Sequence, residues 1–415
     1  MDKKKWTWER KILLLFSLIF VLKGAFYNLY AIPRHLGVTP DDVGHFSYVV
    51  WLYTEHTVPD WETATMEQTA SRNNEDAFAG VMEEAASYQL ALGDGYQATE
   101  SKNWISHHPP LYYLYLLPFF SLTALWTDQL SVFLMVMRFA TTLLGLGTLW
   151  LLWAVCRRTN MSRTGECCAM IGFVFFHALQ YSFSAINNDA MAIFTSSLAF
   201  YFFLRYMERG QKRFLFAFAV SAGLIFCAKY NSVIVLPVYA LAFLAEEIIV
   251  RKTPFRKWAG RALASLVLFT AVCAPLLVQN YARYGRLVSI TAAAFPAGSL
   301  FSLPVLSTAH AESAAAAAGL GETLFGKYHY ASLLGRALVS LTGWRSQVSA
   351  GPAELWLAAV CLWLACAARA YLFVRSAGVD SKPGRGKRLL SAGLLLLFPP
   401  LAAGVCAALW RGSYV

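Results

Sequence analysis

The chain has 415 residues, of which 57% are hydrophobic and only 14% are charged, and its mean hydropathy is +0.47. Runs of about 20 apolar residues, the length that a helix needs to cross a bilayer, recur from Ile12 to Trp410. This composition excludes a soluble globular protein and predicts an all-α polytopic membrane protein.

The net charge of +11 does not indicate a nucleic-acid-binding protein, because the charges are distributed as in a membrane protein. Residues 34–107 hold twelve acidic and three basic residues, whereas the basic excess lies in short loops between apolar runs. Under the positive-inside rule such short basic loops face the cytoplasm. We therefore expect a cytoplasmic N-terminus, membrane lipids as neighbours and no nucleic-acid partner.

The apolar runs predict about nine crossing helices and two long exterior loops. Residues 11–32 cross outward, and the acidic loop of residues 33–107, in which we expect interfacial helices, follows outside. The later crossings are predicted at residues 129–156, 165–184, 189–206, 214–229, 232–250, 259–279, 353–374 and 389–410. The second exterior loop, residues 280–352, separates a module of residues 1–279 from C-terminal helices in residues 353–415.

Residues 109–126 are apolar enough to cross, but a crossing there would move the arginines of residues 157–163 to the exterior. The charge rule argues against that arrangement. We therefore expect a re-entrant or interfacial helix, with Tyr112, Tyr113 and Tyr115 at the depth of the lipid headgroups.

Two carboxylates and an imidazole follow the first crossing, in Asp41, Asp42 and His45. On a helix Asp41 and His45 share one face, and a carboxylate there suits proton-transfer or cation chemistry on a substrate from the lipid phase. The alternative is a helix start, with Thr39 at the N-cap, Pro40 at the first helical position and Asp42 as the capping acid. Asp41 would then only complement the helix dipole.

More polar residues stand where other helices are predicted to reach the exterior. The imidazoles of His107 and His108 suit a phosphate or a metal ion, or they belong to an interfacial turn. Asn188 and Asp189 open a predicted helix, so Asp189 is either a second exterior carboxylate or a cap.

Cations are rare on the predicted exterior side, which makes each of them informative. Lys229, beside Tyr230 in a tight hairpin, and Arg283 in the second exterior loop either bind an anion or extend to the membrane surface. Lys23, about halfway along the first crossing, has no explanation in the sequence. Phosphate-binding loops of the nucleotide-binding type are absent, which disfavours a nucleotide substrate.

Four motifs follow one another within residues 11–279: Pro40-Asp41-Asp42-Val43-Gly44-His45-Phe46, His108-Pro109-Pro110-Leu111-Tyr112-Tyr113, Asn187-Asn188-Asp189-Ala190 and Lys229-Tyr230. In these motifs the chain resembles the GT-C membrane glycosyltransferases, most of all the bacterial protein-mannosyltransferase-like and aminoarabinose-transferase-like group. The family commonly has Asp-Glu where this chain has Asp41-Asp42.

The resemblance implies a GT-C-like helical bundle in the bacterial cytoplasmic (inner) membrane. The activity would be transfer of a sugar from a polyprenyl-phosphate donor to an extracytoplasmic acceptor (glycan, lipid or protein), with inversion of configuration. Asp41 would be the catalytic base, Asp189 the carboxylate of the second site loop, and Lys229 the partner of the carrier phosphate. The sequence identifies no certain cofactor, and a divalent cation is left open.

Two alternative functions, of classes other than enzymes, remain. An ion-coupled lipid or solute carrier could use the exterior carboxylates for coupling ions, although neither internal repeats nor mid-membrane acids are visible. A non-catalytic membrane assembly subunit would keep the same fold with a degenerate site.

Overall fold

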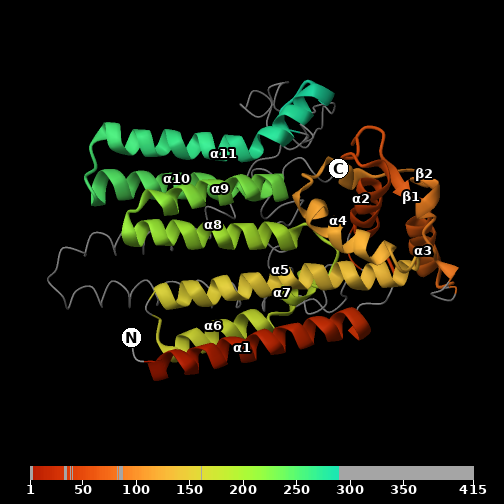
Figure 1. Ribbon diagram of the computed structural model, residues 1–415, viewed down its shortest axis with the longest axis horizontal. Helices are drawn as coiled ribbons and strands as arrows, with labels where there is room; N and C mark the ends of the chain where they lie inside the picture. The colour runs from red at the N-terminus through yellow and green to blue at the C-terminus, as the bar shows by residue number, and fades with distance from the viewer. Residues whose placement is uncertain are drawn as a thin grey trace, which may run out of the picture. The chain divides into compact units, whose positions relative to one another are not determined.

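The structure is a computed structural model that describes residues 3–288, apart from residues 32–34, 38, 40, 82, 84–86 and 160. The described residues are mostly helical (Figure 1). They fall into two compact units, residues 3–204 with 224–230 and residues 205–223 with 231–288. The crossings predicted after residue 288, and most of the second exterior loop, lie outside the described residues.

Four described helices are long and apolar enough to cross a membrane: Glu9–Tyr30, Leu130–Arg158, Asp189–Arg209 and Phe255–Tyr284. They coincide with four of the predicted crossings. The chain is therefore a helical membrane protein in this part, and the total of about nine crossings stays a prediction.

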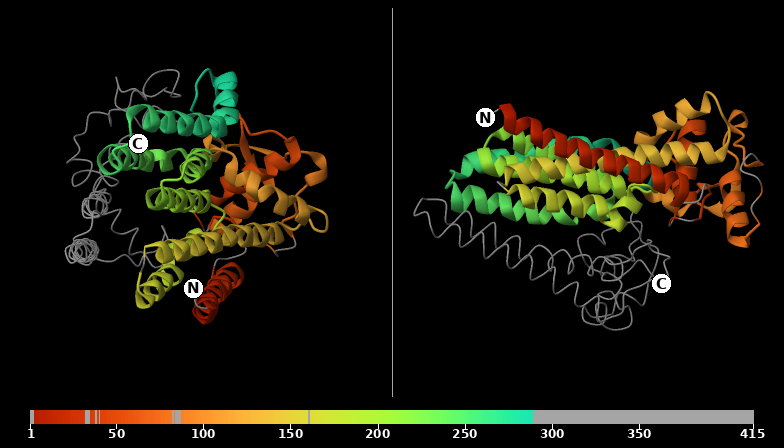
Figure 2. Two further views of the ribbon diagram at one scale, coloured as in Figure 1. Left: turned by 60° about the vertical axis from the view of Figure 1, so that its left-hand side comes forward. Right: turned by 90° about the horizontal axis from the view of Figure 1, so that it is seen from below.

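The first unit is built on α1 (Lys3–Phe26) and α5 (Leu130–Arg158), which pack against each other and against α6 (Arg163–Phe175) (Figures 1 and 2). Glu9 near the start of α1 forms an ion pair with Arg157 at the end of α5. These two helix ends therefore lie together, as they must if the segment between the helices does not cross the membrane.

That intervening segment contains α4 (Leu111–Ala124), a helix of 14 residues. At 1.5 Å per residue it is about 21 Å long, short of the roughly 30 Å of hydrocarbon in a bilayer. Pro110 precedes its first residue, a place where proline is favoured because the first N–H groups of a helix have no partner within it. The length of α4 agrees with the predicted re-entrant or interfacial helix.

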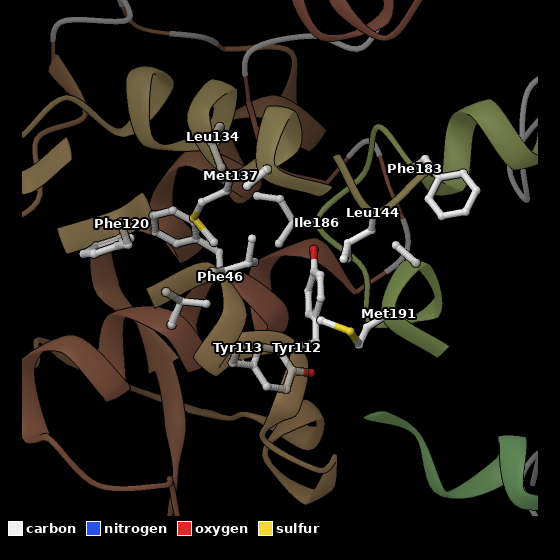
Figure 3. Packing of buried hydrophobic residues seen from close by; sticks show 14 of the residues in the cluster. Phe46, Tyr112, Tyr113, Phe120, Leu134, Met137, Leu144, Phe183, Ile186 and Met191 are labelled. Carbon is white, nitrogen blue, oxygen red and sulfur yellow. The ribbon is translucent and has the colours of Figure 1, made fainter. Parts of the chain in front are cut away.

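The α4 tyrosines are covered by protein and not by lipid headgroups, and their depth in the membrane stays a prediction. Protein covers α4 on two sides, because it packs against both α2 (Asp42–Glu55) and α5. Tyr112 and Tyr113 are fully buried, and Figure 3 shows them in one core cluster with Phe46. Tyr115 is half-buried and donates a hydrogen bond to the carbonyl oxygen of Ala140 at 2.7 Å.

The predicted crossing at residues 165–184 is also wrong as a single helix. It is divided into α6 and α7 (His177–Ser182) by Phe176, whose backbone is extended (φ −72°, ψ 107°). Extended backbone interrupts the ladder of helical hydrogen bonds, so the last carbonyl groups of α6 need other partners.

Lys23 supplies one such partner, which explains a charge that the sequence left without a role. Its ammonium donates a hydrogen bond to the carbonyl oxygen of Val174 at 2.8 Å and lies 4.8 Å from the centre of the Phe175 ring. The carbonyl and the ring face together make the charge tolerable beside an apolar helix.

The segment between α1 and α4 forms its own small layer of the first unit. After η1 (Tyr27–Ala31), which follows α1 directly, its elements are α2, β1 (Thr65–Glu67), α3 (Gln68–Ala79), η3 (Leu92–Asp94), β2 (Ala98–Lys102) and η4 (Trp104–His107). The helices agree with expectation, but the antiparallel pairing of β1 with β2 was not predicted. A three-residue strand is too short to show the alternation of polar and apolar residues by which strands are recognised.

The second unit contains the start of α9 (Lys212–Ala228), most of η5 (Tyr230–Val235), and then α10 (Leu236–Leu244), η6 (Ala245–Val250) and α11 (Phe255–Tyr284). The helix α11 continues five residues beyond the predicted end of its crossing, into the expected second loop.

A cluster of ionic side chains around the buried Glu247 connects η6 to α11 and to Tyr206 in the second unit. Glu247 has no exposed surface, and its carboxylate accepts hydrogen bonds from the Tyr206 hydroxyl at 2.5 Å and from Arg261 at 2.7 Å. Beside it, Nε of Arg251 lies 2.8 Å from Oε1 of Glu246. Removing one member would leave the opposite charges buried without compensation.

We expect Glu247→Ala to destabilise the protein by about 3 kcal/mol, because the partly buried Arg251 and Arg261 would lose their shared carboxylate. Thermal unfolding of the purified protein in detergent measures the loss. The matched control is Glu208→Ala, whose carboxylate is partly exposed and lies 4.0 Å from Arg205. That pair should be worth about 1 kcal/mol or less, and equal losses in the two variants would contradict the structural role of the cluster.

Candidate functional site

The first motif lies at the start of α2, which begins at Asp42 with Asp41 at the N-cap. The predicted start at Thr39 is therefore wrong by two residues, and Pro40 lies outside the described residues. Asp42 nevertheless makes the contact of a capping acid: its carboxylate accepts hydrogen bonds from the backbone N–H of Gly37 at 2.8 Å and of Thr39 at 3.3 Å.

Asp42 is buried beneath this turn, where Arg138 of α5 supplies a nearby positive charge. Burial raises the pKa of the Asp42 carboxyl, whereas the backbone hydrogen bonds and the guanidinium oppose that rise. Arg138 is fully buried too and donates to the carbonyl oxygen of His35 at 3.1 Å. Both side chains thus hold the chain that leads into Asp41.

Asp41 itself is exposed and has a left-handed backbone conformation, with φ of 60°. Aspartate and asparagine tolerate this conformation better than other residues with a β-carbon. Its carboxylate Oδ1 accepts a hydrogen bond from Nε1 of Trp104 at 3.2 Å. The arrangement presents an accessible carboxylate at the N-terminus of a buried helix.

His45, one turn further along α2, is buried against α4. Its Nδ1 lies 2.8 Å from the hydroxyl of Tyr113, and its ring stacks on those of Tyr113 and His108 with centroids 5.8 and 6.1 Å away. The side chains of Asp41 and His45 therefore lie in different environments, one exposed and one enclosed.

His107 and His108 end the segment before α4, with their ring centroids 4.2 Å apart. Nδ1 of His107 contacts the carbonyl oxygen of Trp104, and Tyr48 donates to the carbonyl oxygen of His108 at 3.3 Å. In the described part of the chain, no three His, Cys, Asp or Glu side chains are grouped so that they could hold a metal ion.

The surroundings of these histidines favour their neutral forms. Burial lowers the pKa of His45 from 6.5 to about 3, with a further decrease from the charge of Lys229 and an opposing effect of Asp189. Burial also lowers the pKa of His107, and it lowers that of His108 well below the usual value. Neutral imidazoles keep one donor and one acceptor each for hydrogen bonding.

These pKa shifts predict that acid destabilises the protein. Below pH 6.5 the unfolded chain binds a proton at His45 that the folded protein rejects until about pH 3, so stability falls as the pH decreases through this interval. His45 alone should cost roughly 2 kcal/mol at pH 5. Thermal unfolding at several pH values measures this, and His45→Gln, which still hydrogen-bonds but does not titrate, should weaken the dependence. An unchanged pH profile in that variant would contradict the role of His45.

The first turn of α4 connects this cluster to the third motif. The Tyr112 hydroxyl lies 2.8 Å from Oγ1 of Thr141 and accepts a hydrogen bond from the backbone N–H of Asn187 at 3.0 Å. Asn187 in turn caps α8 (Asp189–Arg209), since its Oδ1 accepts from the backbone N–H of Asp189 at 2.8 Å. The cap of α8 is thus an amide, and the carboxylate of Asp189 is left for another contact.

That contact is Lys229, whose Nζ lies 2.5 Å from Oδ1 of Asp189. The anion that Lys229 meets therefore comes from the protein itself. The side chains of Asp189 and Lys229 keep 43% and 22% of their surface exposed, so a ligand has access to the pair. Because the charges of both residues act on His45, the first, third and fourth motifs come together in the first unit.

Asn188 lies beside this pair and is fully buried. Neither its side-chain nitrogen nor its side-chain oxygen has a hydrogen-bond partner among the described residues. Tyr230 is buried as well, with its ring 5.1 Å from that of Phe226. Arg283 is exposed in the last turn of α11 and belongs to the second unit, so its part in the site stays a prediction.

Comparison with known proteins now adds to this geometry. Residues 107–278 match the sequence profile of the dolichyl-phosphate-mannose-protein mannosyltransferases. The match spans 172 of the 415 residues, so this part of the chain is similar to that family. A comparison with characterised proteins finds no match.

Members of this family are GT-C membrane glycosyltransferases, so the resemblance inferred from the four motifs is confirmed. The protein is an enzyme that uses a sugar donor linked to a lipid phosphate. The matched residues include the second, third and fourth motifs. Asp41 precedes them, and its role therefore rests on the geometry.

Sequence reasoning missed three residues that shape the site: Trp104, Tyr113 and Arg138. Trp104 contacts Asp41 from a position 63 residues away, and Arg138 contacts His35, in the segment before Asp41, from a position 103 residues away. Tyr113 stood in a quoted motif but was assigned to the membrane surface. The one signal for these residues in the sequence was the presence of an arginine, Arg138, within an apolar run.

Proposed function

We propose that this glycosyltransferase moves mannose from a polyprenyl-phosphate carrier to an acceptor on the extracytoplasmic side, with Asp41 as the catalytic base. The observation that carries the proposal is that the exposed Asp41 connects through Trp104 to the histidine cluster, and that this cluster and the Asp189–Lys229 ion pair lie around the first turn of α4. A base and a cation near one another are what a displacement at a sugar phosphate needs.

In this mechanism Asp41 takes the proton from the acceptor nucleophile as that nucleophile attacks the anomeric carbon. The new bond to the sugar forms while the bond to the carrier phosphate breaks, and both electrons of the broken bond leave with the phosphate. A single displacement of this kind inverts the configuration. The exposure of Asp41 supports its role, because the acceptor has to reach it.

Lys229 is proposed to bind the carrier phosphate, whose negative charge grows as it departs. An ammonium binds phosphate as a point charge, and Asp189 holds this one in place when no donor is bound. The buried amide of Asn188 next to the pair supports a polar ligand here, since buried amide groups are normally hydrogen-bonded. His107 and His108 offer further neutral donors.

We also propose that the enzyme lies in the bacterial cytoplasmic membrane with the α2–β2 segment outside. In a variant without native cysteines, a cysteine at Ser101 should then react with an impermeant thiol reagent in intact bacterial cells, whereas one at Gln211 should be protected. Both positions are exposed, so accessibility of the side chain does not distinguish them. The reverse labelling pattern would invert the proposed orientation.

The activity is tested with purified protein in liposomes, given polyprenyl-phosphate mannose with a radiolabelled sugar and an envelope fraction as acceptor. We expect the label to leave the lipid phosphate and to appear on the acceptor. If no lipid-phosphate donor is used and the liposomes instead take up a solute in an ion-dependent way, the carrier reading replaces this proposal.

A further inference from the structure

The indole of Trp104 is placed unusually with respect to the proposed base. It donates a hydrogen bond from Nε1 to Oδ1 of Asp41 at 3.2 Å while 55% of its side chain is exposed. Within the described residues this is the only hydrogen bond that the Asp41 carboxylate accepts. Single exposed tryptophans are common on protein surfaces, but this one directs its donor to a carboxylate rather than to water.

We propose that Trp104 is a positioning residue for the transfer reaction, an inference that rests on Asp41 being the base. The indole N–H occupies Oδ1 and fixes the rotation of the carboxylate. Oδ2 is then left to accept the proton of the attacking nucleophile. A carboxylate held in one orientation does not populate rotamers that cannot accept the proton. This restriction raises the rate of proton transfer without changing the affinity for the sugar donor.

The structure holds Trp104 firmly enough for this task. The preceding residue, Asn103, is buried; its side-chain nitrogen donates to the carbonyl oxygen of Gly44 at 3.1 Å, and its side-chain oxygen accepts from the backbone N–H of Ile105 at 3.0 Å. Asn103 thus attaches the short helix η4 to the first turn of α2. Asp41 and Trp104 therefore lie on either side of the contact between α2 and η4.

Gly44 makes this contact between α2 and η4 possible. A β-carbon at Gly44 would lie 2.6 Å from Cγ1 of Ile105 and 2.8 Å from Oδ1 of Asn103, closer than such atoms approach one another. The absence of a side chain lets η4 approach α2 closely enough for the indole to reach Asp41. His107 also contacts the Trp104 carbonyl oxygen, which connects the same turn to the histidine cluster.

The test compares Trp104→Phe, which keeps an aromatic ring and removes the donor, with Trp104→His, which retains a ring N–H. Rates are measured with polyprenyl-phosphate mannose at a saturating amount of envelope fraction. We expect Trp104→Phe to lower kcat about tenfold with the donor KM unchanged, and Trp104→His to recover part of the loss. The control is Trp126→Phe at the end of α4, where the side chain is 66% exposed; its kcat should equal that of the wild type.

A kcat within twofold of wild type in Trp104→Phe would overturn the positioning role, and so would equal losses in both Trp104 variants together with a lower melting temperature. Asp41→Asn, measured in parallel, distinguishes the two levels of inference. If Asp41→Asn is inactive and Trp104→Phe is normal, only the positioning role fails. If Asp41→Asn is active, the proposed base fails and the role of Trp104 with it.

Discussion

Asp41→Asn should lower the rate of sugar transfer by a factor of about 1,000, within the range that general-base catalysis contributes. The amide does not take up a proton, so the nucleophile would have to attack without a base. Folding should be preserved, because asparagine also tolerates the left-handed conformation of this position and still accepts the hydrogen bond of Trp104. Turnover in liposomes and thermal unfolding in detergent measure the two properties separately.

Asp42→Asn is the matched control for this prediction. Its carboxylate accepts two backbone hydrogen bonds and is enclosed with Arg138, so the amide would turn a donor toward backbone N–H groups. We expect this variant to lose stability and to retain more activity per folded molecule than Asp41→Asn. A well-folded Asp41→Asn enzyme with near-normal turnover would remove the central assignment.

Lys229→Met should weaken the use of the lipid-phosphate donor by a factor of about ten or more, equal to roughly 1.4 kcal/mol or more of lost stabilisation. The ammonium would be lost, and the carboxylate of Asp189 would then face the donor phosphate with a like charge. Lys229→Arg should retain part of the activity, because the charge remains although its geometry changes. Donor KM and kcat in the liposome assay measure the effect.

The double variant Lys229→Met/Asp189→Asn separates lost attraction from new repulsion. If Asp189 repels the phosphate once Lys229 is gone, the double variant should use the donor better than Lys229→Met alone. If the ion pair only supports the fold, both variants should lose thermal stability while the donor KM of the folded protein stays at the wild-type value. That second outcome would count against a phosphate site at Lys229.

The sequence by itself determined the membrane character, the places of four long helices and the family resemblance. Hydrophobic length is a local property, because about 20 successive residues decide whether a helix spans the bilayer. The basic residues near Arg157 predicted that residues 109–126 do not cross, and the contact of Glu9 with Arg157 agrees with this. The motifs around His108, Asp189 and Lys229 could be recognised for the same reason, since each is a short run of residues.

Only the tertiary structure decided which of these residues meet and how. His45 finds its partner Tyr113 at a distance of 68 residues along the chain, and Asp189 finds Lys229 at 40. Such pairings depend on packing between helices, which no local pattern encodes. The same packing buries Tyr113, which its sequence alone placed at the membrane surface.

The breaks in regular structure were likewise decided by distant contacts. An apolar run does not reveal that the backbone of Phe176 is extended. The carbonyl oxygen of Val174 beside this break accepts a hydrogen bond from Lys23 of another helix. The orientation of Asp41 depends on Trp104, which the close approach at Gly44 brings within reach. Hydrophobic length and local motifs depend on successive residues, so the sequence shows them directly. Hydrogen bonds to buried or strained groups require partners that only the folded chain brings together.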